Sequence, residues 1–281
     1  MPRTDASKNS QQPAWSIPSL RDPRFSQSLE RGLAILGCFT AARPVLGIAD
    51  IADHLGMSRS TTHRYVITLV ALGYLEQGAS RKYRLGLRVT DLGMSALNST
   101  GLHEHANGYL EELRQQTSYT AGLAVLDGPD IVFINRVRSF RARDKDPGTR
   151  AGSRLPAYCT SMGKLLLASL PDAEQRNLIA SMKLTKRGPK TITSKKALRE
   201  ELEEVRASGF AASVDELSPG LCSISAGVRD ENGEVVAAVG MLAPSSRISL
   251  EEMIEGLRPH LVSAANGISA RLGYRRDDER H

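Results

Sequence analysis

Apolar residues recur at helical spacing soon after the chain begins. Leu29, Leu33 and Leu36 follow Ser28, a residue type that often caps a helix N-terminus, so a first helix is predicted to start there. After the break at Pro44, four apolar residues at i, i+3, i+4 and i+7 predict a second, short helix. These four residues are Ile48, Ile51, Ala52 and Leu55.

A third helix is expected directly after the second, across a tight turn. Gly56 ends the second helix, and Ser58 is the expected N-cap of the third, whose buried stripe includes Val66 and Leu69. Two short helices that meet across a glycine turn are typical of a helix-turn-helix, here at about residues 48–67.

Two short strands and a helical stretch follow. Residues 74–86 predict a hairpin around a turn at 78–81, which is the wing of a winged helix-turn-helix. The DNA-binding domain is therefore expected over residues 26–88. Residues 89–117 have a helical pattern, interrupted at 98–101, and are expected to form a connecting helix to the next domain.

The rest of the chain alternates strands with helices. The turns at 128–130 and 232–233 each predict a hairpin, and the second of them, Asn-Gly, is a strong hairpin signal. This pattern favours an α+β domain with a mainly antiparallel sheet over residues 118–275, of the pocket-bearing kind that GAF folds exemplify. Its helices are expected to begin near Ser161, Asp172, Ser194 and Ser249.

Composition limits the class of protein. Residues 1–25 are rich in Pro, Ser, Gln and charge, without periodicity, so a disordered arm is expected there. The 281 residues are enough for two domains with separate cores, and no apolar run approaches the roughly 20 residues of a membrane span. The three cysteines, Cys38, Cys159 and Cys222, have no zinc or disulfide spacing. We therefore expect a cytoplasmic protein with no membrane partner.

Positive charge gathers in the predicted helix-turn-helix and wing. The formal net charge is +6, and residues 56–88 contain six Lys or Arg and one acid. A helix fits the major groove of DNA, and hydroxyl and guanidinium groups suit base edges and phosphates. The residues expected to contact DNA are Arg59, Ser60, Thr61, His63, Arg64 and Thr68 on the third helix, and Arg81, Lys82 and Arg84 on the wing.

Five ordered segments carry a family resemblance. They read SLERGLAILGCF, GIADIADHLGMSRSTTHRYVITLVALGYLE, YRLG, SRLPAYCTSMGKLLLASLP and DELSPGLCSISAGVRDENGEVVAAVGM. Together they resemble the IclR family of bacterial transcriptional regulators over about residues 26–275. The resemblance implies a winged helix-turn-helix, a GAF-like effector-binding domain, and dimers that pair into tetramers. The segment RLPAYCTSMG most resembles the same segment in the branch of the family that controls β-ketoadipate and related aromatic-acid pathways. The ligands of that branch are aromatic or dicarboxylic acids.

The same resemblance implies an effector site. In LPAYCTSMGKLLL a strand runs into a helix, and the N–H groups near Ser161 and Met162 would be free donors at the helix N-terminus, where a carboxylate binds well. Gly240 stands where members of the family often have a hydroxyl. The effector-binding residues implied by the family pattern are Leu155, Ser161, Met162, Asp215, Ser223 and Gly240.

Three rival classes of protein fit parts of the sequence. A redox enzyme would use Cys159, although nothing adjacent except the helix N-terminus would lower its pKa. A metal site would need His103 and His105, whose His-x-His spacing turns the two rings to different faces of a helix. A DNA-binding protein whose second domain only oligomerises is the third. We expect no catalytic residue, no metal and no cofactor.

The sequence therefore predicts a transcriptional regulator that responds to a small organic-acid effector and controls genes of aromatic-compound or carboxylic-acid catabolism. It should bind an inverted-repeat operator in double-stranded DNA as a homodimer or homotetramer, because one short helix reads too few base pairs for genomic specificity. The first helix and the connecting helix are the expected contacts between copies.

Overall fold

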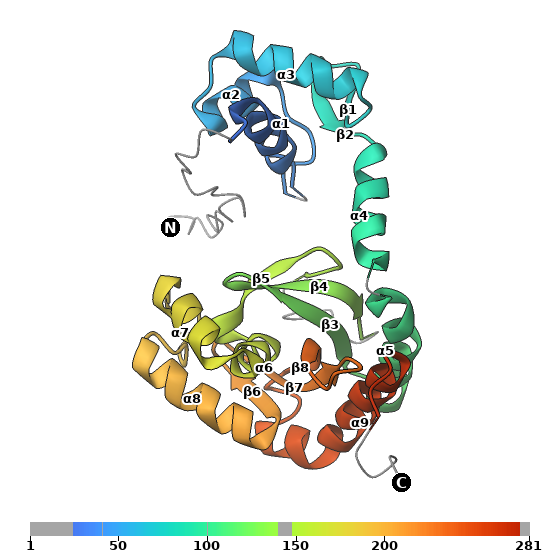
Figure 1. Ribbon diagram of the computed structural model, residues 1–281, viewed down its shortest axis with the longest axis vertical. Helices are drawn as coiled ribbons and strands as arrows, with labels where there is room; N and C mark the ends of the chain where they lie inside the picture. Colours follow the sequence, from blue (N-terminus) through green and yellow to red (C-terminus); the bar gives the residue numbers. More distant parts are fainter. Residues whose placement is uncertain (1–24, 41, 100, 140–147, 276–281) are drawn as a thin grey trace, which may run out of the picture. The chain divides into compact units, whose positions relative to one another are not determined.

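The computed structural model describes residues 25–40, 42–99, 101–139 and 148–275. The chain divides into two compact units, Met1–Ala96 and Leu97–His281, which are described separately (Figure 1). The disordered arm expected over residues 1–25 lies outside the described residues, apart from its last position.

Three helices and a hairpin form the core of the first unit. The helices are α1 (Gln27–Gly37), α2 (Ile48–Leu55) and α3 (Arg59–Ala71). The strands β1 (Leu75–Gln77) and β2 (Tyr83–Leu85) pair antiparallel. The predicted winged helix-turn-helix is confirmed.

The turn between α2 and α3 forms for local reasons. Gly56 ends α2 with a φ of 64°, a left-handed conformation that glycine adopts without steric cost. The Ser58 side chain then caps α3 by accepting a hydrogen bond from the backbone N–H of Thr61 at 3.2 Å. Ile51 of α2 and Val66 of α3 are fully buried in one core, so the two helices are held at a fixed angle to each other.

The first helix packs differently from the expectation. Its N-cap is Ser26 rather than Ser28. Leu29 and Leu33 are 64% and 46% exposed, whereas Ile35 is fully buried. The spacing of the leucines identified the helix correctly, but two of them face away from the core of this unit.

The predicted connection over residues 89–117 is two helices, and the break between them falls at the expected interruption. α4 spans Arg88–Asn98 and α5 spans Leu102–Thr117. Gly101, with a φ of 65°, begins α5 and breaks the helical path. None of the residues of α4 is buried, whereas α5 buries Leu110 and Leu113 in the core of the second unit.

A six-stranded antiparallel sheet lies at the centre of the second unit, in the order β5-β4-β3-β8-β7-β6. Its strands are β3 (Thr120–Asp127), β4 (Asp130–Val137), β5 (Arg154–Pro156), β6 (Phe210–Val214), β7 (Leu221–Arg229) and β8 (Val235–Pro244). The remaining helices are α6 (Ser161–Ser169), α7 (Asp172–Ser181), α8 (Lys195–Ser208) and α9 (Leu250–Arg271).

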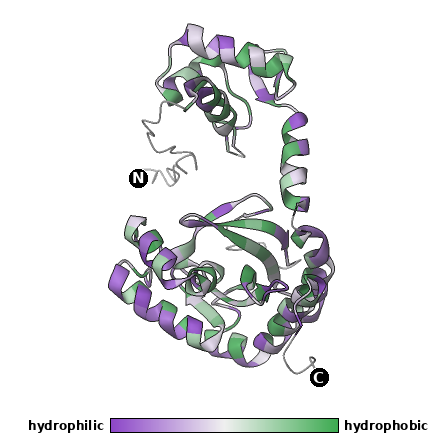
Figure 2. Ribbon diagram, in the orientation of Figure 1, coloured by the Kyte–Doolittle hydropathy of each residue, from purple (hydrophilic) through white to green (hydrophobic). Residues whose placement is uncertain are grey.

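Helices cover both faces of this sheet. α5 and α9 pack on one face, around a core that contains Leu110 and Ile224, and α6 packs on the other face, backed by α8, around Phe133 and Leu202. Figure 2 shows hydrophobic residues along the strands and hydrophilic residues on the outer turns of α7 and α8. The predicted α+β fold with an antiparallel sheet is confirmed.

The predicted hairpins and helix starts are confirmed, but one strand was not expected. β3 and β4 form the first hairpin and β7 and β8 the second. Ser249 and Glu252 form the capping box of α9. β6, with the sequence FAASV, was missed because three of its five residues are Ala or Ser, which carry little strand propensity.

Candidate functional site

The third helix presents most of the predicted DNA-contacting residues to solvent. Thr62, Val66 and Leu69 are buried on its inner side. The exposed predicted residues are Arg59, Ser60, His63, Arg64 and Thr68. The outer face of α3 is therefore basic and rich in hydroxyl groups, as major-groove and phosphate contacts require.

All three hydroxyls of this set already have partners at the cap or within the helix, and the Ser60 Oγ lies 3.2 Å from the Ser58 Oγ. Thr61 is half-buried, and its Oγ1 lies 2.8 Å from the cap hydroxyl of Ser58. The Thr68 hydroxyl donates to the backbone oxygen of Arg64 at 3.0 Å. Thr61 therefore stabilises the start of α3, and the side chains of α3 most open to DNA are its two arginines and His63.

The wing presents two cations at its tip and pairs the third. Arg81 and Lys82 are exposed, and Arg81 holds the left-handed turn position with a φ of 55°. Arg84 lies opposite Glu76 across the hairpin, and its Nη2 is 2.8 Å from that carboxylate. The charge of Arg84 is thus partly neutralised by the protein itself.

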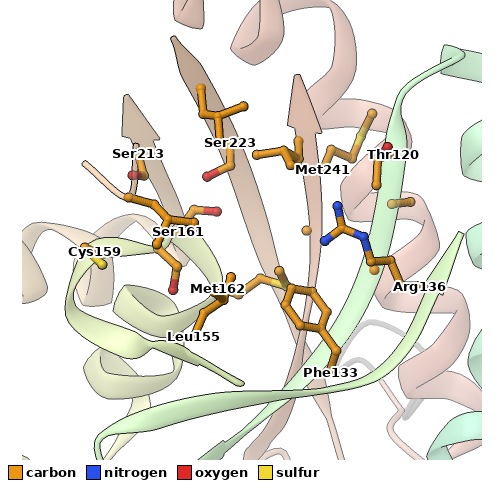
Figure 3. A pocket seen from close by; sticks show the side chains of 17 residues that line it. Thr120, Phe133, Arg136, Leu155, Cys159, Ser161, Met162, Ser213, Ser223 and Met241 are labelled. Atoms are coloured by element: carbon orange, nitrogen blue, oxygen red, sulfur yellow. The ribbon is translucent and has the colours of Figure 1, made fainter. Parts of the chain in front are cut away.

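A cavity lies between the sheet and the N-terminus of α6. It encloses about 530 Å³ that no atom fills, counting the part open to solvent. Five of the six predicted effector residues line it: Leu155, Ser161, Met162, Ser223 and Gly240 (Figure 3). The fold thus gathers residues that lie as much as 85 positions apart in the sequence, from Leu155 to Gly240.

Two paired glycines let side chains of the cavity lining lie directly against the sheet. Gly122 of β3 and Gly240 of β8 are direct partners in the sheet. A Cβ at Gly122 would lie 3.2 Å from Cε1 of Phe133, and a Cβ at Gly240 would lie 2.7 Å from Cγ of Met162. Phe133 and Met162 therefore lie over bare backbone, and Gly240 leaves room for Met162 where a hydroxyl side chain would stand.

The N-terminus of α6 supplies hydrogen-bond donors to the cavity. The Thr160 hydroxyl accepts from the N–H of Gly163 at 3.1 Å. Among the described residues, the N–H groups of Ser161 and Met162 have no acceptor. The Ser161 side chain is 1% exposed, and its Oγ also has no partner in the described part of the chain. These groups can bind an anion.

Arg136 of β4 also lines the cavity and was not predicted. The β4 strand carries one extra residue, because Leu123 pairs with Asn135 and Ala124 pairs with Phe133. This bulge reverses the alternation of side chains, so that Phe133 and Arg136 share the cavity face. The Asn135 amide instead donates to Asn107 of α5 at 3.1 Å, on the opposite face.

The structure corrects the expected place of Asp215. It does not line the cavity, although Ser213 and Leu217 on either side of it do. Asp215 adopts a left-handed conformation, with a φ of 56°, and its carboxylate accepts a hydrogen bond from the N–H of Gly220 at 2.6 Å. The carboxylate therefore closes the loop between β6 and β7.

A buried ion cluster fixes α6 one turn beyond Ser161. Lys164 is 1% exposed, and its Nζ donates to Glu201 of α8 at 2.6 Å and to Glu216 at 2.8 Å. Burial raises the pKa of Glu216 above its ordinary value, although Lys164 opposes this shift. The cluster joins α6, α8 and the loop after β6.

The residues that a redox enzyme or a metal-binding protein would use are not suited to those roles. Cys159 is fully buried, and burial raises the pKa of its thiol to about 12, so the thiolate is scarce at neutral pH. His103 places its Nδ1 3.1 Å from the backbone oxygen of Ile134. Within the described residues, no three His, Cys, Asp or Glu side chains gather where they could hold a metal ion. None of the described helices has both the length and the apolar character that a membrane crossing needs.

Comparison with known protein families accounts for both units. Residues 28–79 match the IclR helix-turn-helix domain. Residues 94–270 match the C-terminal domain of the bacterial transcriptional regulator IclR. The chain belongs to the IclR family. It is thus a transcriptional regulator with a DNA-binding and an effector-binding domain, as predicted.

Individual IclR-family relatives align over nearly their whole lengths. The HTH-type transcriptional regulator XynR of Escherichia coli K12 is 33% identical over 249 residues, which cover 88% of this chain and 98% of XynR. The Pca regulon regulatory protein of Pseudomonas putida is 34% identical over 251 residues, 89% of this chain and 86% of that protein.

A solved IclR homolog contains a small aromatic acid. This homolog, from Microbacterium hydrocarbonoxydans, is complexed with 4-hydroxybenzoate and superposes with a TM-score of 0.78 at 28% identity. The match covers 87% of this chain and 98% of the homolog. The likeness extends over both units of the fold.

Proposed function

We propose that this IclR-family regulator changes its affinity for operator DNA when a small organic acid, aromatic or dicarboxylic, occupies the cavity. The observation that carries the proposal is the N-terminus of α6, where two backbone N–H groups and the buried Ser161 hydroxyl lack partners among the described residues. An effector carboxylate would satisfy these donors. The 4-hydroxybenzoate bound by the homolog supports a ligand of this class.

The proposal assigns the residues as follows. α3 contacts base edges and phosphates through Arg59, Ser60, Thr61, His63, Arg64 and Thr68, and the wing contacts the DNA backbone through Arg81, Lys82 and Arg84. Leu155, Ser161, Met162, Ser223 and Gly240 contact the effector. We assign no catalytic residue and no cofactor, because the proposed response to the effector is a change of binding affinity and needs no chemistry.

Exposed apolar residues support self-association of the DNA-binding unit. Leu29 and Leu33 on α1, and Leu92 and Met94 on α4, are all exposed, and Leu87 just before α4 is 81% exposed. Exposed apolar side chains on helices are typical of a surface that a protein partner covers. We propose that a second copy covers them, giving a homodimer or homotetramer that binds an inverted-repeat operator in the cytoplasm.

The genes under control follow from the effector. One relative is the Pca regulon regulatory protein, and the homolog with 4-hydroxybenzoate binds an aromatic acid. We therefore propose aromatic-compound or carboxylic-acid catabolism as the regulated process.

The proposal is tested with a panel of aromatic and dicarboxylic acids in a thermal-shift assay, followed by operator gel shifts. A ligand at 100 times its dissociation constant stabilises the folded state by roughly 2.7 kcal/mol, which this assay detects. By linkage, operator DNA must change effector affinity by the same factor as effector changes DNA affinity.

Ser161→Asp is the decisive variant for the site. It places a fixed negative charge where the effector carboxylate would bind, so the variant should bind DNA and ignore the effector. Asn177→Asp, an exposed change of equal charge on α7, is the control and should respond like wild type. Unchanged effector affinity in Ser161→Asp would remove the carboxylate site from the α6 N-terminus.

A further inference from the structure

One large apolar side chain of α3 takes no part in the core of its unit. Four apolar residues of this helix are buried in that core or packed against it, namely Tyr65, Val66, Leu69 and Val70. Ile67 lies between them in the sequence, but it stands outside the core and is 46% exposed. Packing within the first unit therefore does not account for an isoleucine at this position.

Helix geometry places Ile67 on the outward face of α3. Residues three or four apart lie on the same face of a helix. Ile67 comes three residues after Arg64 and seven after Ser60, and all three are exposed. Thr62 and Leu69 are buried on the other side of the helix. Ile67 thus belongs to the face that the proposed function directs into the major groove.

The neighbours of Ile67 argue against its burial in a contact with another protein copy. One turn before it, His63 and Arg64 are polar and exposed, and one turn after it Ala71 has only a small side chain. A protein surface that covered Ile67 would also remove the Arg64 guanidinium from water, which is costly unless the charge finds a partner. DNA supplies such partners to Arg64, because both base edges and phosphates accept hydrogen bonds.

The major groove contains one apolar group that an isoleucine can contact, the C5 methyl of thymine. The β-branch of isoleucine leaves one strongly preferred rotamer in a helix, so the side chain loses little entropy when it makes a contact. Isoleucine is a weaker helix former than alanine or lysine. An exposed isoleucine therefore does not favour α3 itself, but it suits the recognition of a methyl group.

We propose that Ile67 reads the methyl group of a thymine in the operator. Three residues advance a helix by about 4.5 Å, whereas stacked base pairs are roughly 3.4 Å apart. The thymine is therefore one or two base pairs from the position that Arg64 reads. This inference rests on the proposed function, which directs α3 to base edges, and it adds a residue that determines sequence preference.

The test uses the full chain and an operator that this chain selects from a random double-stranded DNA library. Each thymine of the operator is replaced in turn by deoxyuridine, which keeps the base pair and removes only the methyl group. Fluorescence anisotropy then gives the affinities of wild type, Ile67→Ala, Ile67→Val and Arg64→Ala. Val236→Ala is the control variant, because Val236 is an exposed β-branched residue of the second unit.

We expect one thymine in each half-site at which loss of the methyl group weakens wild-type binding about fourfold, the effect of burying one such group. Replacement in both half-sites should weaken binding about fifteenfold, because the two contributions add in free energy. Ile67→Ala should bind thymine and deoxyuridine equally at this position and respond like wild type at the others. Ile67→Val and Val236→Ala should keep the wild-type preference.

Three results would overturn the inference. The first is a wild-type protein that binds equally well after every thymine replacement. The second is a methyl effect that persists unchanged in Ile67→Ala, which would assign the methyl contact to another residue. The third is a change of oligomeric state in Ile67→Ala, measured by analytical ultracentrifugation, which would place Ile67 in a contact between copies.

Arg64→Ala separates failure of this inference from failure of the proposed function. If Arg64→Ala changes the base preference, α3 reads the operator and the proposed function stands, whatever the result for Ile67. If neither Arg64→Ala nor Ile67→Ala changes the base preference, α3 does not read base edges. The proposed DNA contacts of α3 then fail together with the inference.

Discussion

Lys164 is a buried cation whose removal should destabilise the second unit while leaving the cavity lining unchanged. Met has a similar length and volume and keeps the apolar packing of the lysine stem, so Lys164→Met removes mainly the charge and its two hydrogen bonds. Glu201 is 33% exposed and can turn to water. Glu216 is 7% exposed and would be left as an unpaired buried carboxylate.

The loss of stability in Lys164→Met can be estimated from the Glu216 carboxylate that is left without its cation. Removing one partner of a buried ion pair typically costs about 3–5 kcal/mol, because the other charge stays desolvated. For a protein unit of this size, each kcal/mol shifts the melting temperature by about 2–4 °C. We therefore expect the transition of the second unit to fall by roughly 6–20 °C at neutral pH.

The loss should also depend on pH, with a defined sign. Burial already raises the pKa of Glu216 in the folded protein, so its protonated form favours folding and this contribution is lost as pH rises through the folded pKa. Without Lys164 the carboxylate loses the cation that lowered its pKa, so the folded pKa rises further. Lys164→Met should therefore regain stability as pH falls from 8 toward 5, more than wild type does.

Thermal denaturation followed by circular dichroism at several pH values measures both effects. Lys196→Met is the matched control, because Lys196 pairs with Glu200 on the surface of α8 with both side chains largely exposed, and it should melt close to wild type. Lys164→Met with Glu216→Gln should recover part of the stability. A Lys164→Met protein that melts like wild type at every pH would refute the argument.

Three further predictions concern DNA and the thiols. Arg81→Ala with Lys82→Ala should lower the log–log salt slope of operator binding by about 0.9 for each phosphate that the wing no longer neutralises; an unchanged slope and affinity would exclude the wing from the DNA interface. Arg64→Ala should alter sequence preference as well as affinity, by about 1–3 kcal/mol at a base edge, as binding to an operator library would show. All three cysteines are buried, so thiol reagents should react only after unfolding. A thiol that reacts rapidly in the native protein, and whose reaction is lost in Cys159→Ser, would support the interpretation as a redox enzyme.

The parts of the fold that were predicted correctly depend on local chemistry. Gly56 and Ser58 identify the helix-turn-helix because a left-handed glycine and a capping hydroxyl act within four residues of each other. Asn232-Gly233 identifies the last hairpin for the same reason. These signals need no knowledge of tertiary contacts.

The features that were missed depend on contacts between distant segments. If side chains alternated strictly along β4 from Phe133, Arg136 would lie on the face opposite the cavity. The bulge that brings Arg136 to the cavity face is visible only in the pairing of β4 with β3. Leu29 and Leu33 have helical spacing, but spacing alone does not say that they face away from the core of their unit. Asp215 matched the family pattern by position, yet its backbone conformation turns the carboxylate to Gly220. One available signal was overlooked: Gly122 interrupts a strand, which marks close backbone approach.

The bulge in β4 separates a residue's position in the sequence from its place on the cavity wall. Deleting the single residue Ile134 would remove the bulge and leave Phe133 and Asn135 adjacent with their present partners in β3, so Arg136 would still face the cavity and Asn135 would still face α5. A regulator of this architecture can therefore lose this residue through one codon deletion and keep the same side chains on each face of the sheet. Ligand preference among relatives should then be compared after aligning their bulges, because an alignment of residue types alone would pair side chains that face opposite sides of the sheet.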